Sequence, residues 1–207
     1  MNSFSAAEFR RRAEAHLVDT PGDFSQFGDY RLNSGLLSIV SGSGVKLRDA
    51  AVLIGVVEDD EAHVILTKRQ DSLRKHSGQI AFPGGKVDGD ESPELAAIRE
   101  AEEEIGLGRH FIDVIGAMPQ IPVLSGFRIT PVLATIRPGF TLDPNPDEVE
   151  HIFKVPLSFL MDPLNHEQDG WEKAGLHVRY YVMPYEGWRI WGITAGIIRS
   201  VYERLYE

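Results

Sequence analysis

The feature that most constrains the fold is one short segment whose start, apolar spacing and end all specify an α-helix. Ser92 followed by Pro93 is a helix start signal, because proline is tolerated at the first helical position, and Gly106 is a natural stop. Between them, apolar residues recur at the spacing that places them on one helix face: Leu95, Ile98, Ala101 and Ile105. We therefore predict a helix whose back is buried against the rest of the fold.

The same segment is strongly acidic. Residues 84 to 107 carry eight acidic side chains against two basic ones. Glu100, Glu103 and Glu104 share a face of the predicted helix, because residues three and four apart are neighbours, and we expect them to converge on one exposed patch. Crowded carboxylates suit a hard divalent cation such as Mg²⁺. The alternative is an ordinary solvated face, which is the interpretation we favour for Glu94 and Glu102.

Strands dominate the rest of the chain, with helices between them. Alternating apolar patterns predict strands in six places: 50–57, 63–69, 111–117, 128–136, 148–155 and 176–182. Ser5 begins an N-terminal helix with Glu8 three residues on, residues 20–48 indicate irregular connection, and 192–205 is a closing helix. The predicted fold class is α/β (α+β), a mixed β-sheet between α-helices. We expect an N-terminal helix and irregular extension over 1–48 and the main domain over 49–207.

Composition excludes several classes of partner. The chain has 207 residues, is 43% hydrophobic, carries a formal net charge of -10 and contains no cysteine. Nucleic acids and anionic membranes select a basic surface, so neither is an expected partner. No apolar run reaches the roughly 18 residues that span a bilayer. We predict a cytoplasmic protein, in which any anionic ligand must be met by a local basic cluster or a metal ion.

The spacing of the acidic segment is specific. Gly85 is followed after five residues by Glu91 and after seven more by Arg99 and Glu100, within the run "GGKVDGDESPELAAIREAEEEIGL". In this pattern the chain resembles the Nudix hydrolases. The resemblance implies the Nudix fold and the hydrolysis of a nucleoside diphosphate linked to another moiety, assisted by Mg²⁺ or Mn²⁺.

The resemblance also implies roles for individual residues. It assigns the metal ions to three glutamates: Glu100, Glu103 and Glu104. The carbonyl of Gly85 would be a further ligand, Arg99 would pair with a carboxylate and orient the cluster, and Glu91 would brace the loop. Gly84 and Gly85 let the backbone approach the ligand and the metal where a side chain would obstruct.

The general base stays open at the level of sequence. A carboxylate beside the metals can accept the proton of the attacking water. Glu100, Glu103 and the acids of the loop near residue 148 are candidates, and Glu148 is the loop residue we assign. The alternative for Asp147, Glu148 and Glu150 is the polar edge of a strand.

A basic stretch lies immediately upstream, in "ILTKRQDSLRKHSGQIAFPGG" at residues 65–85. Its pattern is similar to the motif of the coenzyme A pyrophosphatases within the Nudix superfamily, with Ile65 in place of a leucine and Gln70 in place of a serine. We expect Arg69 and Arg74 to bind the substrate's phosphates, since arginine binds phosphate through two points. A solvated basic loop is the alternative.

The resemblance leads to a ranked set of functions. The first is hydrolysis of coenzyme A, or an acyl or oxidised form of it, to 3',5'-ADP and 4'-phosphopantetheine, by a possible homodimer. The second is a Nudix enzyme acting on ADP-ribose, NADH or a nucleoside triphosphate, and the third is a binding module without turnover. Phe127, Trp188 and Trp191 are candidates for stacking an adenine, although such aromatic residues are more often part of the core.

Overall fold

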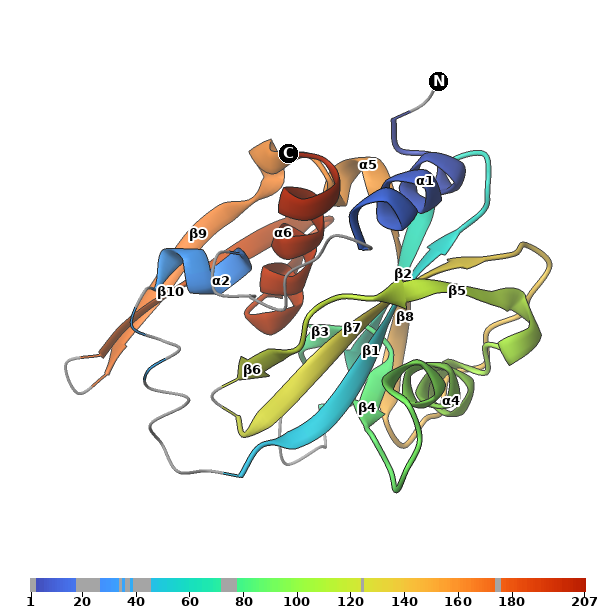
Figure 1. The fold of residues 1–207 in the computed structure, drawn as a ribbon, viewed down its shortest axis with the longest axis horizontal. Helices are drawn as coiled ribbons and strands as arrows, with labels where there is room; N and C mark the ends of the chain where they lie inside the picture. Colours follow the sequence, from blue (N-terminus) through green and yellow to red (C-terminus); the bar gives the residue numbers. More distant parts are fainter. Residues whose placement is uncertain are drawn as a thin grey trace.

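The computed structural model describes residues 3–17, 27–33, 35, 38, 46–71, 78–123, 125–173 and 176–207. Its centre is a mixed sheet with helices on both faces (Figure 1). The strands of this sheet are β1 (Arg48–Val57), β2 (His63–Arg69), β3 (Ile80–Ala81), β4 (Gly84–Lys86), β5 (Ile112–Ala117), β6 (Ile121–Val123), β7 (Phe127–Ile136) and β8 (Val149–Pro156). The predicted fold class is therefore confirmed.

The order of the strands makes the sheet mixed. The main path runs β3-β2-β1-β7-β5, while β4 pairs with β1, β6 with β7 and β8 with β2. β1 and β7 run parallel over ten residue pairs, Arg48↔Phe127 to Val57↔Ile136, and the other pairs are antiparallel. The long parallel pair holds β4 and β6 at one end of the sheet, on opposite sides of β1 and β7.

A smaller antiparallel sheet and the helices complete the described residues. The second sheet consists of β9 (Glu167–Lys173), β10 (Leu176–Tyr185) and β11 (Trp188–Trp191). The helices are α1 (Ala6–Leu17), α2 (Gly28–Leu32), α4 (Pro93–Ile105), α5 (Leu157–Leu160) and α6 (Ile193–Leu205), with 3₁₀ turns at Arg109–Phe111 and Pro163–Asn165. None of these helices has the length and apolar character required to cross a bilayer.

Alternating side chains of β1 build two separate cores. Ile54 and Val56 belong to the core shared with α1 and α6, whereas Leu53 and Val57 belong to the core shared with α4. Successive residues of a strand point to opposite faces, so each face needs its own cover. The helix α4 thus covers one face of the sheet, and α1 and α6 cover the other (Figure 1).

The N-terminal region contributes to the core. Ser5 Oγ accepts a hydrogen bond of 3.2 Å from the amide of Glu8, as the sequence predicts for the start of α1. Phe9 and Ala13 of this helix are fully buried. The division of the chain after residue 48 stays a prediction.

All six predicted strands are present, but the irregular character expected over 20–48 is wrong for residues 28–32. Residues 28–32 form α2, and Tyr30 within it is buried. Tertiary packing of α2 on α6 and β10 stabilises a helix that is too short to persist alone. No apolar pattern in the sequence predicts the short strands β3, β4 and β6, or the strands β9 and β11.

Candidate active site

The helix α4 begins and ends where the sequence predicts. Ser92 Oγ accepts a hydrogen bond of 3.3 Å from the amide of Leu95, and Pro93 occupies the first turn. Gly106 adopts a left-handed conformation with φ of 67° and closes the helix. A glycine at this position has no Cβ to oppose that conformation.

The buried face of α4 differs from the predicted one. Leu95 is 56% exposed, and the buried face is formed by Ala96, Ala97, Ala101, Glu104 and Ile105. The short alanine side chains let the helix lie close to β1 and β4. The expected exposed patch of three carboxylates is therefore wrong for Glu104, which is only 3% exposed.

Glu104 has polar partners in this buried position. Its carboxylate accepts a hydrogen bond of 3.1 Å from the amide of Gly84 and lies 3.4 Å from the guanidinium of Arg69. Burial raises the pKa of Glu104 to about 7; the Gly84 amide and Arg69 lower it, and the charges of Glu100 and Glu148 raise it. Arg69, one of the two arginines predicted to bind phosphate, thus contacts the last turn of α4.

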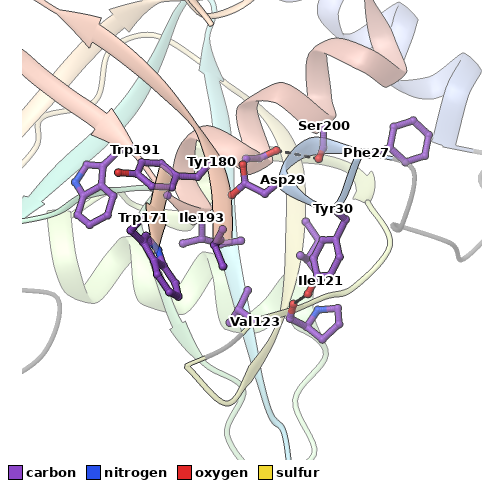
Figure 2. Close-up of a pocket in the computed structure, with 14 residues that line it drawn as sticks. Phe27, Asp29, Tyr30, Ile121, Val123, Trp171, Tyr180, Trp191, Ile193 and Ser200 are labelled. Atoms are coloured by element: carbon purple, nitrogen blue, oxygen red, sulfur yellow. Dashed lines mark hydrogen bonds between the residues drawn. The ribbon is translucent and has the colours of Figure 1, made fainter. Parts of the chain in front are cut away.

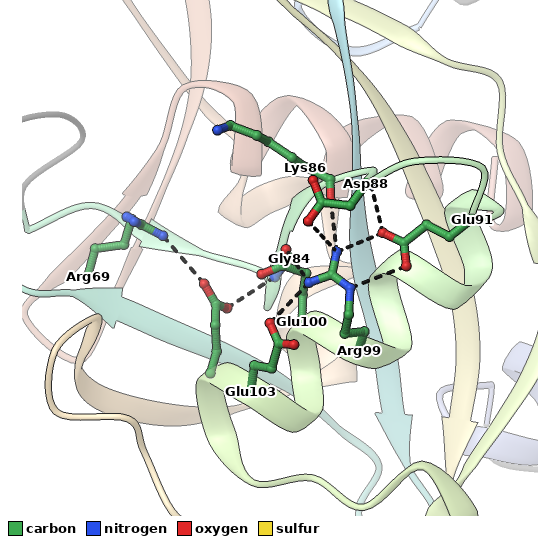
Figure 3. A network of polar contacts seen from close by, with 9 residues as sticks. Arg69, Gly84, Lys86, Asp88, Glu91, Arg99, Glu100 and Glu103 are labelled. Carbon is green, nitrogen blue, oxygen red and sulfur yellow. Dashed lines mark hydrogen bonds and ion pairs between the residues drawn. The ribbon is translucent and has the colours of Figure 1, made fainter.

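Arg99 is the centre of the exposed part of the cluster (Figure 3). Its guanidinium donates to both carboxylate oxygens of Glu91, at 2.7 and 3.2 Å. It also donates to Glu100 at 2.9 Å, to Glu103 at 3.0 Å and to the carbonyl of Lys86 at 3.0 Å. These contacts join the loop before α4 to the helix itself.

The same contacts set the charge states of the carboxylates around Arg99. Hydrogen bonding to Arg99 lowers the pKa of Glu91, and the amide of Asp88 adds to this effect. Burial raises the pKa of Glu100, although Arg99 opposes that shift. Glu91 therefore keeps its negative charge most firmly, and the more buried Glu100 and Glu104 keep theirs least firmly.

Both glycines of β4 lie too close to their neighbours to carry a side chain. A Cβ on Gly85 would lie 2.3 Å from a carboxylate oxygen of Glu100, and a Cβ on Gly84 would lie 2.3 Å from the carbonyl oxygen of Ala51. Contacts this short require the neighbours to move. Gly85 therefore allows the backbone of β4 to lie directly against the carboxylate of Glu100, and Gly84 allows it to lie close to β1.

The loop before β8 brings Glu148 towards the cluster. The amide of Asn145 donates to the carbonyl of Glu104 at 2.9 Å, and the amide of Glu148 donates to the carbonyl of Asn145 at 3.1 Å. The charge of Glu148 raises the pKa of both Glu100 and Glu104. Glu148 is thus the loop carboxylate whose charge acts on Glu100 and Glu104.

Other predicted candidates lie elsewhere. Glu150 pairs with Lys68 at 2.6 Å. Trp188 packs against Phe153 rather than in the acidic cluster. Three further candidates do not meet the cluster: Asp147 is exposed, Trp191 packs against Tyr180, and Phe127 lies under Arg48. Arg74 lies outside the described residues.

The donor chemistry of the cluster fits a hard divalent cation, because carboxylate oxygens dominate it and the backbone of Gly85 lies directly beside the carboxylate of Glu100. Within the described residues, however, no three His, Asp or Glu side chains are arranged so that they could hold one metal ion together. Glu100 and Glu103 are held by Arg99, and Glu104 is held by Gly84 and Arg69. Sequence patterns missed the two backbone groups of β4 that contact this cluster, the Gly84 amide and the Lys86 carbonyl.

Comparisons with known proteins identify the family. The NUDIX domain model matches residues 46–178. A protein named uncharacterized Nudix hydrolase NudL from Cronobacter sakazakii is 40% identical over 81% of this chain and 88% of its own length. The protein of the same name from Citrobacter koseri is 42% identical over 78% of this chain and 85% of its own length. A solved Nudix hydrolase from M. Smegmatis, RenU, is 27% identical over 53% of this chain and 70% of that chain, with a TM-score of 0.46. The chain belongs to the NUDIX domain family and is a Nudix hydrolase.

Proposed function

We propose that the protein hydrolyses the pyrophosphate bond of coenzyme A or its derivatives, giving 3',5'-ADP and 4'-phosphopantetheine. Water adds to one phosphorus, the bridging P–O bond breaks, and each product carries one of the two phosphates. The observation that supports this substrate most is the 3.4 Å contact between Arg69 and Glu104. It joins the basic motif typical of coenzyme A pyrophosphatases to the acidic helix.

The proposed metal ligands are Glu100, Glu103, Glu104 and the carbonyl of Gly85, and the ion is Mg²⁺ or Mn²⁺. When bound, a divalent cation neutralises the charge of the pyrophosphate and lowers the pKa of water. Arg99 donates to both Glu100 and Glu103, so it holds these two carboxylates next to each other. Glu91 fixes Arg99 from the loop side.

Three further residues are proposed to act on the substrate and the attacking water. Glu148 is the proposed general base, since it lies towards Glu100 and Glu104 and accepts a proton when charged. Arg69 is the proposed phosphate ligand, because its guanidinium already lies beside the acidic cluster. Arg74 is proposed as a second phosphate ligand on the sequence motif alone.

The alternatives keep the same machinery and change the substrate to ADP-ribose, NADH or a nucleoside triphosphate. A substrate panel separates them. The purified protein is incubated with each compound under Mg²⁺ and under Mn²⁺, and the products are identified by mass. Release of 4'-phosphopantetheine from coenzyme A at the highest kcat/KM supports the proposal, whereas selective release of AMP from ADP-ribose contradicts it. A homodimer and a cytoplasmic location stay predictions.

A further inference from the structure

A cavity of about 170 Å³ lies outside the acidic cluster, between α2, β6, the second sheet and the start of α6. Five aromatic residues contribute to its wall: Phe27, Tyr30, Trp171, Tyr180 and Trp191. Figure 2 shows Trp171, Tyr180 and Trp191 on one side and Tyr30 and Ile121 on the other. Trp171 is 41% exposed. An aromatic wall that stays partly open to solvent is typical of a binding site for an apolar group.

The size of the cavity limits what it accommodates. An apolar protein cavity of about 150 Å³ holds one benzene molecule, which has six carbons. A cavity of 170 Å³ therefore suits an apolar group of roughly six or seven carbons. A long fatty chain exceeds this volume.

One charged group also lines the cavity among the described residues, the carboxyl of Asp29. Its Oδ1 accepts a hydrogen bond of 3.1 Å from the amide of Tyr181, which holds the side chain in place. A carboxyl accepts further N–H donors, because its two oxygens offer about four lone-pair sites. The cavity therefore suits an apolar group that is attached to an amide.

Strand pairing sets the distance across the sheet from the cavity wall to β4. Ile121 of the cavity wall pairs with Ile129, which pairs with Ala50, which pairs with Lys86. Three strand spacings separate the two ends of this row, about 14 Å. Lys86 follows Gly85, the predicted metal ligand, and its carbonyl contacts Arg99.

A second connection joins the cavity to the same region. Thr194 follows Ile193 of the cavity wall, and its hydroxyl donates to the carbonyl of Ile80 at 2.9 Å. The chain then passes from Ile80 in β3 to Gly84 in β4, whose amide contacts Glu104. Within the described residues β4 pairs only with β1, so it is an edge strand at this end of the sheet.

The pantetheine arm of coenzyme A has the length that this separation requires. About thirteen covalent bonds join its phosphorus to its sulfur, and an extended chain gains about 1.2 Å per bond, so the arm spans roughly 15 Å. The arm carries two amide N–H groups near the sulfur end. An acyl group on the sulfur would therefore arrive at the cavity with an amide beside it.

We propose that this cavity binds the acyl group of an acyl-coenzyme A of medium chain length, with Asp29 accepting an amide N–H of the pantetheine arm. The inference rests on the proposed function, since it assigns one end of the same substrate. It names the preferred substrate as a thioester with an acyl chain of about six or seven carbons.

The test compares chain lengths and two cavity variants. For the wild type, kcat/KM is measured with coenzyme A and with acetyl, hexanoyl and palmitoyl thioesters, and hexanoyl-coenzyme A is expected to exceed the acetyl form by about tenfold or more. Val123→Phe narrows the cavity and should remove this preference. Ile193→Ala enlarges it and should move the optimum to a longer chain, which a misfolded protein would not do.

A control and a binding measurement accompany the kinetics. Leu164 is 88% exposed and far from the cavity wall, so Leu164→Phe adds the same ring without narrowing the cavity and should keep the hexanoyl preference. Two of the three tryptophans, Trp171 and Trp191, line the cavity. Hexanoyl-coenzyme A should therefore change the tryptophan emission of a Glu103→Gln protein more than coenzyme A does.

The outcomes separate this inference from the proposed function. Equal kcat/KM for coenzyme A and hexanoyl-coenzyme A, unchanged by Val123→Phe and Ile193→Ala, overturns the acyl site and leaves coenzyme A hydrolysis standing. Hydrolysis of ADP-ribose without hydrolysis of coenzyme A or any thioester overturns both.

Discussion

The guanidinium of Arg69 lies 3.4 Å from the carboxylate of Glu104, although 34 residues separate the two in the chain. Arg69 ends β2 and Glu104 lies in the last turn of α4. The contact places the proposed phosphate ligand Arg69 beside the proposed metal ligand Glu104.

Replacing Arg69 with alanine should raise the KM for coenzyme A by about ten- to a hundredfold, because a charge-assisted hydrogen bond contributes about 1.5–3 kcal/mol. Steady-state kinetics measure the effect. Arg109→Ala is the matched control, since Arg109 also pairs with a glutamate of α4, Glu102, but on the exposed side. A KM unchanged by Arg69→Ala contradicts a phosphate-binding role.

Replacing Glu104 with glutamine should abolish hydrolysis and yet stabilise the metal-free protein at alkaline pH. Burial raises the pKa of Glu104 from 4.5 to about 7. The folded state therefore favours the protonated carboxyl, and the stability that proton contributes is present below pH 4.5 and lost as the pH rises through 7. Above that pH, Glu104→Gln should raise the free energy of unfolding by up to about 3 kcal/mol.

Glu103→Gln is the control for Glu104→Gln. The side chain of Glu103 is 60% exposed, so its replacement should also stop hydrolysis but give no comparable gain in stability. Urea denaturation of the metal-free proteins at about pH 8.5 distinguishes the two. A lower stability for Glu104→Gln than for wild type at that pH would show that the buried carboxylate is net favourable.

Replacing Glu91 with alanine should lower kcat/KM by about tenfold or more, because Arg99 loses the carboxylate that holds it on the loop side. Glu102→Ala is the matched control, since Glu102 contacts Arg109 and not Arg99. Its kinetics should stay at the wild-type level. Equal activity of the two variants would show that Glu91 is an ordinary surface charge.

Asp29 should give the protein a second pH-dependent contribution to stability. Burial raises the pKa of Asp29 to about 7, the amide of Tyr181 opposes that shift, and the charge of Glu203 adds to it. The extra proton stabilises the folded state below its unfolded pKa of 3.8 and is lost as the pH rises through 7. Asp29→Asn should therefore reduce the fall in unfolding free energy between about pH 5 and pH 8.5, by up to about 3 kcal/mol.

Urea titrations at the two pH values measure the Asp29 effect. Asp113→Asn is the control, because Asp113 is an exposed partner of Arg10 and should leave the fall unchanged. An identical fall in wild type and Asp29→Asn would mean that Asp29 stays charged in the folded state across this range.

Local signals in the sequence were sufficient for α4 and the long strands. The Ser92 cap and the Gly106 stop act through neighbouring backbone groups, so both could be predicted without the tertiary fold. The strands β1 and β7 are also long enough to show clear apolar patterns. Shorter strands such as β3 and β4 exist only because a neighbouring strand supplies their partners, which no local pattern records.

The candidate site could be predicted in its residue types but not in its burial. Helical spacing predicts that Glu100, Glu103 and Glu104 share one face. The burial of Glu104, however, depends on how closely Ala97 and Ala101 allow α4 to approach the sheet. Arg99 could be predicted to pair with a carboxylate. That it pairs with four of them, Asp88, Glu91, Glu100 and Glu103, follows from the path of the loop before α4.

The most direct test of the central claim is the rate of coenzyme A hydrolysis by wild type and Glu103→Gln as Mg²⁺ or Mn²⁺ is titrated, with both products quantified by mass. We expect equal amounts of 3',5'-ADP and 4'-phosphopantetheine from wild type, release that saturates with the metal, and a rate for Glu103→Gln that is lower by at least about a hundredfold. Wild type that leaves coenzyme A intact at saturating metal, or Glu103→Gln that matches wild type, would contradict it.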